Sequence, residues 1–184
     1  MLDERKNPWQ VVSTKEIYDN KWISVREDAV LQPDGEPGIY GVVHFKNIAI
    51  GVLAIEDENI YLVGQYRYPL ERYSWEIPEG GCAKGEDPLI AAQRELEEET
   101  GLRAKNWRKM GEAHLSNSVS DELAIWYVAT ELLQGEHRPE GTEQLEVRSV
   151  SFDDAVRMAM HGDITDAISL LAIMQYQLLK ENHF

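Results

Sequence analysis

The first third of the chain is built from short apolar runs separated by polar and turn-forming residues. These runs cover residues 11–19, 22–31 and 38–45 and are rich in β-branched and aromatic side chains, as β-strands are. Between the last two runs stands PDGEPG, residues 33–38, whose proline and glycine residues favour a turn. We therefore expect an antiparallel β-region at the N-terminus.

Strand-like runs continue along the rest of the chain. They are residues 49–57, 59–68, 74–81, 107–115, 123–132 and 145–152. The first two are parted only by Glu58 and its polar neighbours, which predicts a buried hairpin. The run 74–81 is a short strand that leads into a glycine-rich loop.

Three stretches have helical patterns. A helix over residues 88–100 has an apolar stripe of Leu89, Ala92 and Leu96. A helix over 153–160 is ended by Gly162. The last helix, over 166–181, has a stripe formed by Ile168, Leu171, Ala172, Gln175 and Leu178. Strands interspersed with helices indicate an α/β fold with a mixed sandwich architecture.

The helix over 88–100 has clear end signals and an acidic face. Asp87 suits the N-cap and Pro88 the first helical position, where a missing N–H costs nothing, while Gly101 suits the left-handed position that ends many helices. Glu95, Glu98 and Glu99 are spaced i, i+3 and i+4 and share one face. Such a face is either a solvated surface or a site where a hard cation such as Mg²⁺ neutralises the carboxylates.

Composition narrows the class of protein. The 184 residues suit one domain with a short addition, and an apolar content of 43% can build a core. No run approaches the roughly 20 apolar residues of a membrane helix, and no secretory signal is visible, so we expect a cytoplasmic protein. A net charge of −15 disfavours binding to a nucleic-acid backbone. The single Cys82 excludes an intrachain disulfide.

Residues 80–102 contain a longer pattern. They match G-x5-E-x7-R-E-U-x-E-E-x-G-U, in which U is aliphatic, without a mismatch. The matching residues are Gly80, Glu86, Arg94, Glu95, Leu96, Glu98, Glu99, Gly101 and Leu102. This segment resembles the signature of the Nudix hydrolases. The resemblance implies an α/β/α sandwich with a mixed sheet, in which the signature forms a strand, a loop and a helix.

The wider distribution of motifs is similar to the ADP-ribose pyrophosphatase branch of that family. The resemblance implies two parts: residues 1–45, an N-terminal β-region for dimerisation and the substrate pocket, and residues 46–184, the hydrolase domain. In relatives, aromatic residues at the positions of Trp22 and Tyr40 sandwich the nucleobase; alternatively, both pack on a strand face. Relatives with an arginine just after the second aromatic differ from this chain, which has His44 and Phe45 there.

The resemblance also implies roles within the hydrolase domain. Mg²⁺, for which Mn²⁺ can substitute, is held by the Glu79 backbone carbonyl and the side chains of Glu95, Glu98 and Glu99. Arg94 lies four residues before Glu98 and is expected to orient that carboxylate. Glu86 holds the loop or acts through water.

Two further residues are expected near the substrate. Arg67 is expected to contact the substrate diphosphate, with a surface ion pair as the alternative. Glu76 either lines the pocket or is structural.

A general base completes the predicted site. In this branch it comes from a late acidic loop, here GEHRPEGTEQLEVR, and alignment on the following strand favours Glu143 over Glu140. A signature glutamate such as Glu98 is the other option.

The expected reaction is Mg²⁺-dependent hydrolysis of the diphosphate of ADP-ribose or a related nucleoside diphosphate sugar by a homodimer. The products would be a nucleoside monophosphate and a sugar phosphate. Alternatives are a preference for GDP-mannose or another nucleotide, or a nucleotide-sugar sensor without turnover. An RNA 5′-end pyrophosphohydrolase is disfavoured by the acidic charge.

Overall fold

The computed structural model describes residues 6–135 and 144–181. The chain forms two compact units. One unit contains Met1–Asn47 together with His114–Glu122, and the other contains Ile48–Ala113 together with Leu123–Phe184. A segment from the middle of the chain therefore belongs to the N-terminal unit, which the sequence pattern does not indicate.

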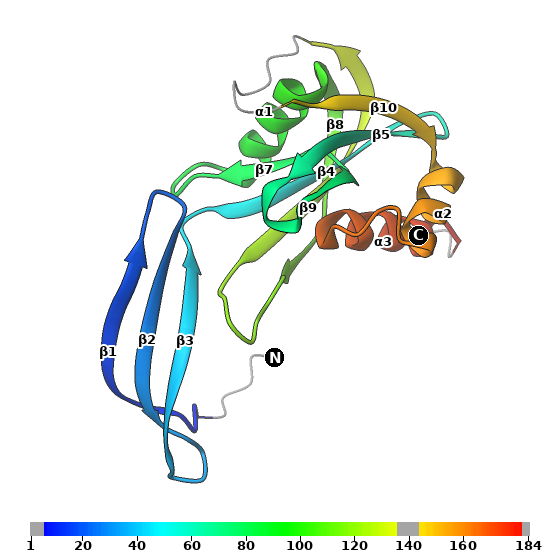
Figure 1. The fold of residues 1–184 in the computed structure, drawn as a ribbon. Helices are drawn as coiled ribbons and strands as arrows, with labels where there is room; N and C mark the ends of the chain where they lie inside the picture. Colours follow the sequence, from blue (N-terminus) through cyan, green and yellow to red (C-terminus); the bar gives the residue numbers. More distant parts are fainter. Residues whose placement is uncertain (1–5, 136–143, 182–184) are drawn as a thin grey trace. The chain divides into compact units, whose positions relative to one another are not determined.

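The N-terminal unit is a three-stranded antiparallel sheet in the order β1-β2-β3 (Figure 1). Its strands are β1 (Gln10–Asp19), β2 (Ile23–Leu31) and β3 (Pro37–Phe45), which confirms the three expected strands. The turn between β2 and β3 closes through Gly35, whose φ of 89° suits a residue without a side chain. Every residue of β1 is exposed in this single chain.

The segment His114–Glu122 is attached to β3 by a set of hydrogen bonds. Val43 N–H donates to the Val119 carbonyl at 2.9 Å, and the Tyr40 hydroxyl donates to the Ser118 carbonyl at 2.7 Å. Asp121 accepts the Phe45 N–H at 2.9 Å and pairs with His44. Burial raises the pKa of Asp121, but the His44 and Phe45 hydrogen bonds outweigh it, and the pKa lies below its usual value.

The second unit is built on a seven-stranded mixed sheet with the path β10-β5-β4-β9-β8, in which β6 pairs with β5 and β7 with β4. The strands are β4 (Ile48–Glu56), β5 (Asn59–Arg67), β6 (Arg72–Glu76), β7 (Glu79–Cys82), β8 (Leu102–His114), β9 (Leu123–Gln134) and β10 (Glu146–Ser151). β4 and β5 form the expected hairpin, whereas β4 and β9 run parallel. The mixed α/β class predicted from the sequence is confirmed.

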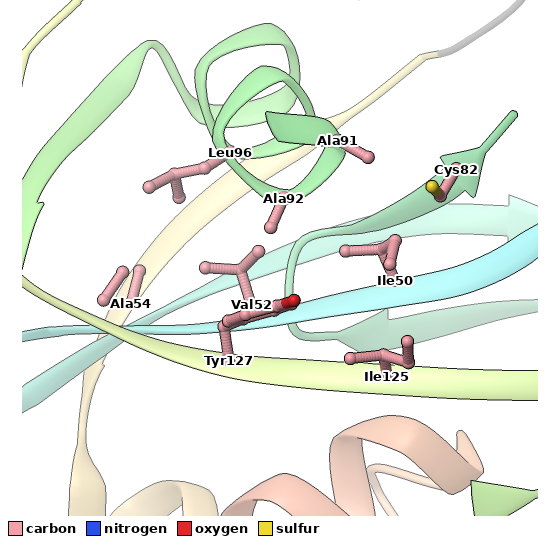
Figure 2. Close-up of a cluster of buried hydrophobic side chains, with 10 residues drawn as sticks. Ile50, Val52, Ala54, Cys82, Ala91, Ala92, Leu96, Ile125 and Tyr127 are labelled. Atoms are coloured by element: carbon pink, nitrogen blue, oxygen red, sulfur yellow. The ribbon is translucent and has the colours of Figure 1, made fainter. Parts of the chain in front are cut away.

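The helices are α1 (Pro88–Thr100), α2 (Phe152–His161) and α3 (Ala167–Glu181), with a short 3₁₀ turn, η1 (Tyr68–Leu70), after β5. Successive residues of β4 point to opposite faces of the sheet. Ile50 and Val52 pack against Ala92 and Leu96 of α1 in a fully buried cluster (Figure 2). On the other face, Gly51 lies against Ile168 of α3. β4 is therefore covered on both sides, and its nearly continuous apolar sequence is explained.

The single strand expected over residues 74–81 is wrong. The segment is divided into β6, which pairs with β5, and β7, which pairs with β4. Pro78 lies at the step, where it has no N–H for a ladder, and its carbonyl accepts the Val52 N–H at 2.9 Å. The strand expected over 107–115 is longer than predicted, since β8 begins directly after the Gly101 cap.

The stripe predicted for the last helix is only partly correct. Ile168 and Ala172 are buried, but Leu171 and Leu178 are 40% and 58% exposed, while Ser169 and Ile173 are fully buried. The hydrophobic pattern predicted the wrong buried face of this helix, because Ser169 is buried although it is polar. None of the helices within the described ranges is long and apolar enough to cross a membrane.

Candidate active site

The acidic helix is fixed at both ends as its sequence predicts. The Asp87 carboxylate accepts the Leu89 N–H at 2.8 Å, and Pro88 occupies the first turn. At the other end Gly101 adopts a φ of 70° and donates its N–H to the Glu97 carbonyl. These caps set the phase of α1, so that Glu95 and Glu99 face inward while Glu98 stays half-exposed.

Arg94 lies among the carboxylates of the signature. Its Nη1 donates to Glu95 at 2.6 Å and to Glu98 at 3.1 Å, and its Nε lies 3.3 Å from Glu86. Nη2 donates to the Gly81 carbonyl at 2.8 Å. Partial burial disfavours the charge, but these carboxylates outweigh it and raise the pKa of Arg94. The predicted contact between Arg94 and Glu98 is present, together with three that were not predicted.

Glu86 stabilises the loop that precedes the helix. Its carboxylate accepts the Ala83 N–H at 3.0 Å in addition to its contact with Arg94. The hydrogen bonds from Arg94 and from the Ala83 backbone lower the pKa of Glu86. Glu86 therefore holds the loop, one of the two roles expected for it.

Glu95 and Glu99 are the two most deeply placed carboxylates of the helix, 9% and 3% exposed. Glu99 accepts the Glu79 N–H at 2.9 Å. The Glu95 carboxylate lies against Gly80, where an added Cβ would come within 2.0 Å of it. Glycine at position 80 thus leaves room for the Glu95 carboxylate, which would have to shift if position 80 carried a side chain.

The carboxylates offer only oxygen donors, which suit a hard divalent cation such as Mg²⁺. Within residues 6–135 and 144–181, however, no three His, Cys, Asp or Glu side chains are already grouped so that they could hold one ion. Arg94 pairs instead with Glu95 and Glu98. The donor chemistry fits the metal, and binding would require these carboxylates to exchange contacts with Arg94.

The side chain of Glu79 points away from the signature helix toward α3. Its carboxyl accepts the Ser169 hydroxyl at 2.9 Å. Burial, together with the charge and hydrogen bond of Asp166 and the charge of Glu76, raises the pKa of Glu79 well above its ordinary value. Sequence reasoning missed Ser169 and Asp166, although Asp166 and Ser169 have the spacing of an N-cap pair, and Asp166 accepts the Ser169 N–H at 2.8 Å.

Arg67 and Glu76 are paired. The Arg67 Nε lies 3.0 Å from both carboxylate oxygens of Glu76, which is 3% exposed. Burial opposes the charge of Arg67, but Glu76 outweighs it and raises the pKa of the guanidinium. The ion pair foreseen as an alternative for Arg67 is present, with a buried partner, and it fixes the orientation of the guanidinium.

The two aromatic residues predicted to hold a base lie far apart in one chain. Tyr40 pairs with Asp28, whereas Trp22 precedes Ile23, the partner of Phe45. At roughly 3.3 Å per residue, about 20 Å separates them along the strands. Trp22 is 58% exposed, and the Tyr40 and Trp9 rings pack edge to face at a centroid distance of 5.4 Å.

Glu140 and Glu143, the candidates for the general base, lie outside the described residues.

Two family models match different parts of the chain. A family model described as the NUDIX domain matches residues 45–170, and one described as the nucleoside diphosphate sugar hydrolase N-terminal domain matches residues 9–43. An ADP-ribose pyrophosphatase from Bacillus subtilis (strain 168) is 36% identical over 175 residues, 94% of each chain.

Two further similarities extend over nearly the whole chain. A methanol dehydrogenase activator from Bacillus methanolicus is 32% identical over 172 residues, 92% of each chain. A crystal structure of an ADP compounds hydrolase has a TM-score of 0.86 and covers 98% of both chains at 18% identity, which shows a shared fold.

Proposed function

Because the chain belongs to the Nudix family and is a pyrophosphohydrolase of the nucleoside diphosphate sugar type, we propose that its substrate is ADP-ribose or a close relative of it. The reaction would split the diphosphate and release a nucleoside monophosphate and a sugar phosphate. The match of residues 9–43 to the nucleoside diphosphate sugar hydrolase N-terminal domain, together with the similarity to an ADP-ribose pyrophosphatase, carries this proposal. The placement of Glu95 and Glu99, two nearly buried carboxylates set by Gly80 and by the Glu79 N–H, supports metal-dependent hydrolysis of the diphosphate. Buried carboxylates are costly unless a charge compensates them.

We propose that Glu95, Glu98, Glu99 and the backbone carbonyl of Glu79 hold Mg²⁺, with Mn²⁺ as a substitute. Bound Mg²⁺ would neutralise the phosphate oxygens and activate the attacking water. Before the metal binds, Arg94 orients Glu95 and Glu98 and compensates their charge through Nη1, a role that Mg²⁺ would share once these contacts are exchanged.

Arg67 is the proposed ligand of the substrate diphosphate. Glu76 engages its Nε and Nη2, and a guanidinium has five N–H donors, so the remaining edge can reach a phosphate oxygen. Because Glu76 is buried and fixed, the guanidinium needs little reordering to bind.

We propose Glu143, and as a second choice Glu140, as the general base. Both stand in the sequence between β9 and β10.

We propose that the protein works as a homodimer whose two N-terminal sheets complete the base-binding pocket. A base held between Trp22 and Tyr40 needs two chains, because these residues are about 20 Å apart along one sheet. The exposed apolar side chains of this sheet support an interface; Val11, Val12, Ile17, Tyr18 and Ile39 are all more than half exposed.

The test is a panel of nucleoside diphosphate sugars incubated with the protein and Mg²⁺, with each product identified. We expect AMP from ADP-ribose. Glu99→Gln should lose more than about a hundredfold in kcat, above the usual cost of losing an outer-shell partner.

The control is Glu97→Gln on the same helix, whose carboxylate pairs with Arg103 at 2.6 Å; it should keep most of the activity. Faster turnover of GDP-mannose or another nucleotide would reassign the substrate. Tight binding of a nucleotide sugar without turnover would instead indicate a sensor.

A further inference from the structure

Ser169, near the start of α3, is a fully buried polar residue that contacts the strand leading into the signature. Its hydroxyl accepts the Ile77 N–H at 2.9 Å and donates to the Glu79 carboxyl at 2.9 Å. One side chain on α3 thus holds the segment Ile77–Glu79 at two points. These partners lie 92 and 90 positions away in the sequence.

The segment held by Ser169 is the one that positions Glu99. The Glu79 N–H donates to the Glu99 carboxylate at 2.9 Å. In the middle of the segment Ile77–Glu79, the Pro78 carbonyl accepts the Val52 N–H. Ser169 and Glu99 are therefore connected through Glu79: Ser169 bonds to its side chain, and its backbone N–H bonds to Glu99.

A glycine allows α3 to come close enough for these contacts. A Cβ at Gly51 would lie 2.5 Å from Ile168 and 3.1 Å from Ile77. Ile168 is the residue directly before Ser169, so the close packing on β4 fixes the distance between Ser169 and the Ile77–Glu79 segment. The helix N-terminus is also held, because Asp166 accepts the Ser169 N–H.

We propose that Ser169 is a positioning residue of the metal site. It holds the Ile77–Glu79 segment against α3, and through the Glu79 peptide it keeps the Glu99 carboxylate in place for a divalent cation. The proposal rests on the proposed metal-dependent function and extends it to a helix that contributes no signature residue.

The test compares Ser169→Ala with Ser151→Ala as a matched control. Ser151 also accepts a backbone N–H with its hydroxyl, from Asp154 at 3.1 Å, but it caps α2. Mn²⁺ affinity is measured by electron paramagnetic resonance without substrate, and unfolding in urea is measured for both variants. We expect Ser169→Ala to weaken Mn²⁺ binding by about 10- to 100-fold, as loss of an outer-shell partner does. Ser151→Ala should lose stability but keep its affinity.

Kinetics supply a second readout. At saturating substrate, Ser169→Ala should need more Mg²⁺ for half-maximal rate, whereas its KM for substrate at saturating Mg²⁺ should change less than about twofold. Equal Mn²⁺ affinity in Ser169→Ala and the wild type would overturn the positioning role and leave the proposed function standing. Weakened affinity in Ser169→Ala, but no hydrolysis of any nucleotide sugar by the wild type, would overturn the function and leave the role of Ser169 standing.

A second pair of variants covers the case in which Ser169→Ala does not fold. Glu79→Gln keeps an oxygen that can accept the Ser169 hydroxyl, whereas Glu79→Ala removes it. We expect Glu79→Ala to lose distinctly more Mn²⁺ affinity than Glu79→Gln. Equal losses would contradict a path from Ser169 through the Glu79 side chain.

Discussion

At the scale of single residues, Arg94 shows how one side chain can organise several carboxylates. It contacts Glu86, Glu95 and Glu98 and the Gly81 carbonyl through three different nitrogens. The planar fork of a guanidinium makes this possible, whereas an ammonium is a single point charge on a flexible stem.

We therefore expect Arg94→Lys to lower kcat/KM by about 10- to 100-fold, because one ammonium cannot replace these contacts. Arg103→Lys is the control, since Arg103 is 63% exposed at its side chain and pairs with Glu97 on the same helix. Steady-state kinetics at several Mg²⁺ concentrations measure the effect. If both variants lose activity equally, the arrangement around Arg94 has no special role.

Gly80 allows a second test at the same scale. Gly80→Ala would place a methyl group about 2.0 Å from the Glu95 carboxylate, so the carboxylate must move. We expect kcat/KM to fall at least as far as in Arg94→Lys, and Mn²⁺ affinity to fall with it. Gly41→Ala is the control, because a Cβ there meets nothing within 4 Å. Normal Mn²⁺ binding by Gly80→Ala would show that metal binding does not depend on the position of the Glu95 carboxylate.

Sequence spacing predicted the contact between Arg94 and Glu98 because both lie on one helix, four residues apart. It could not predict the contact between Ser169 and Glu79, whose partners are 90 positions apart and meet only after α3 packs on β4. The same reason explains why the buried partner of Arg67 was not assigned: Glu76 reaches Arg67 only after β6 pairs with β5.

At the scale of elements, the limits of α1 followed from Asp87, Pro88 and Gly101, whose chemistry acts within one turn. The division between β6 and β7 did not follow from local chemistry, because the two strands pair with different neighbours. Local signals thus define where a helix ends, whereas the partner of a strand depends on the whole sheet.

The N-terminal sheet contains a buried carboxylate that makes its stability depend on pH. Asp28, 4% exposed, accepts the Thr14 hydroxyl at 2.7 Å and pairs with Arg26 at 3.0 Å. The hydrogen bonds from Thr14 and Arg26 lower the pKa of Asp28 below its ordinary value of 3.8. The folded sheet therefore binds this proton less readily than the unfolded chain.

We expect the stabilisation from Asp28 to be complete above the ordinary pKa and to be lost as the pH falls through the lower, folded pKa. Hydrogen exchange of the β1 and β2 amides, followed from about pH 5 down to about pH 2, can detect this loss. Asp28→Asn should remove this part of the pH dependence. An unchanged acid profile in Asp28→Asn would contradict the assignment.

At the scale of the whole molecule, a division into an N-terminal β-region and a hydrolase domain was expected from the sequence. The sequence did not predict that His114–Glu122 belongs to the N-terminal unit, because this depends on backbone contacts with β3. Such contacts leave no periodic pattern in the sequence.

The exposed apolar side chains of the N-terminal sheet lead to a prediction about assembly. All ten residues of β1 are exposed in one chain, including Val12 at 65%, and exposed apolar side chains gathered on one strand are typical of an interaction surface. We expect light scattering at micromolar concentration to give twice the 21.0 kDa of one chain. Val12→Glu should shift the protein toward a monomer, because a charge would be buried in the interface.

Because Trp22 and Tyr40 can meet only across two chains, Val12→Glu should also raise the KM for ADP-ribose while Mn²⁺ affinity in the hydrolase domain stays unchanged. Glu16→Gln on the same exposed strand is the control and should remain a dimer. A wild-type protein with the mass of one chain that still binds ADP-ribose tightly would rule out a pocket shared between subunits. The base would then have to be held by one chain alone, and only one of the two aromatic residues could stack on it.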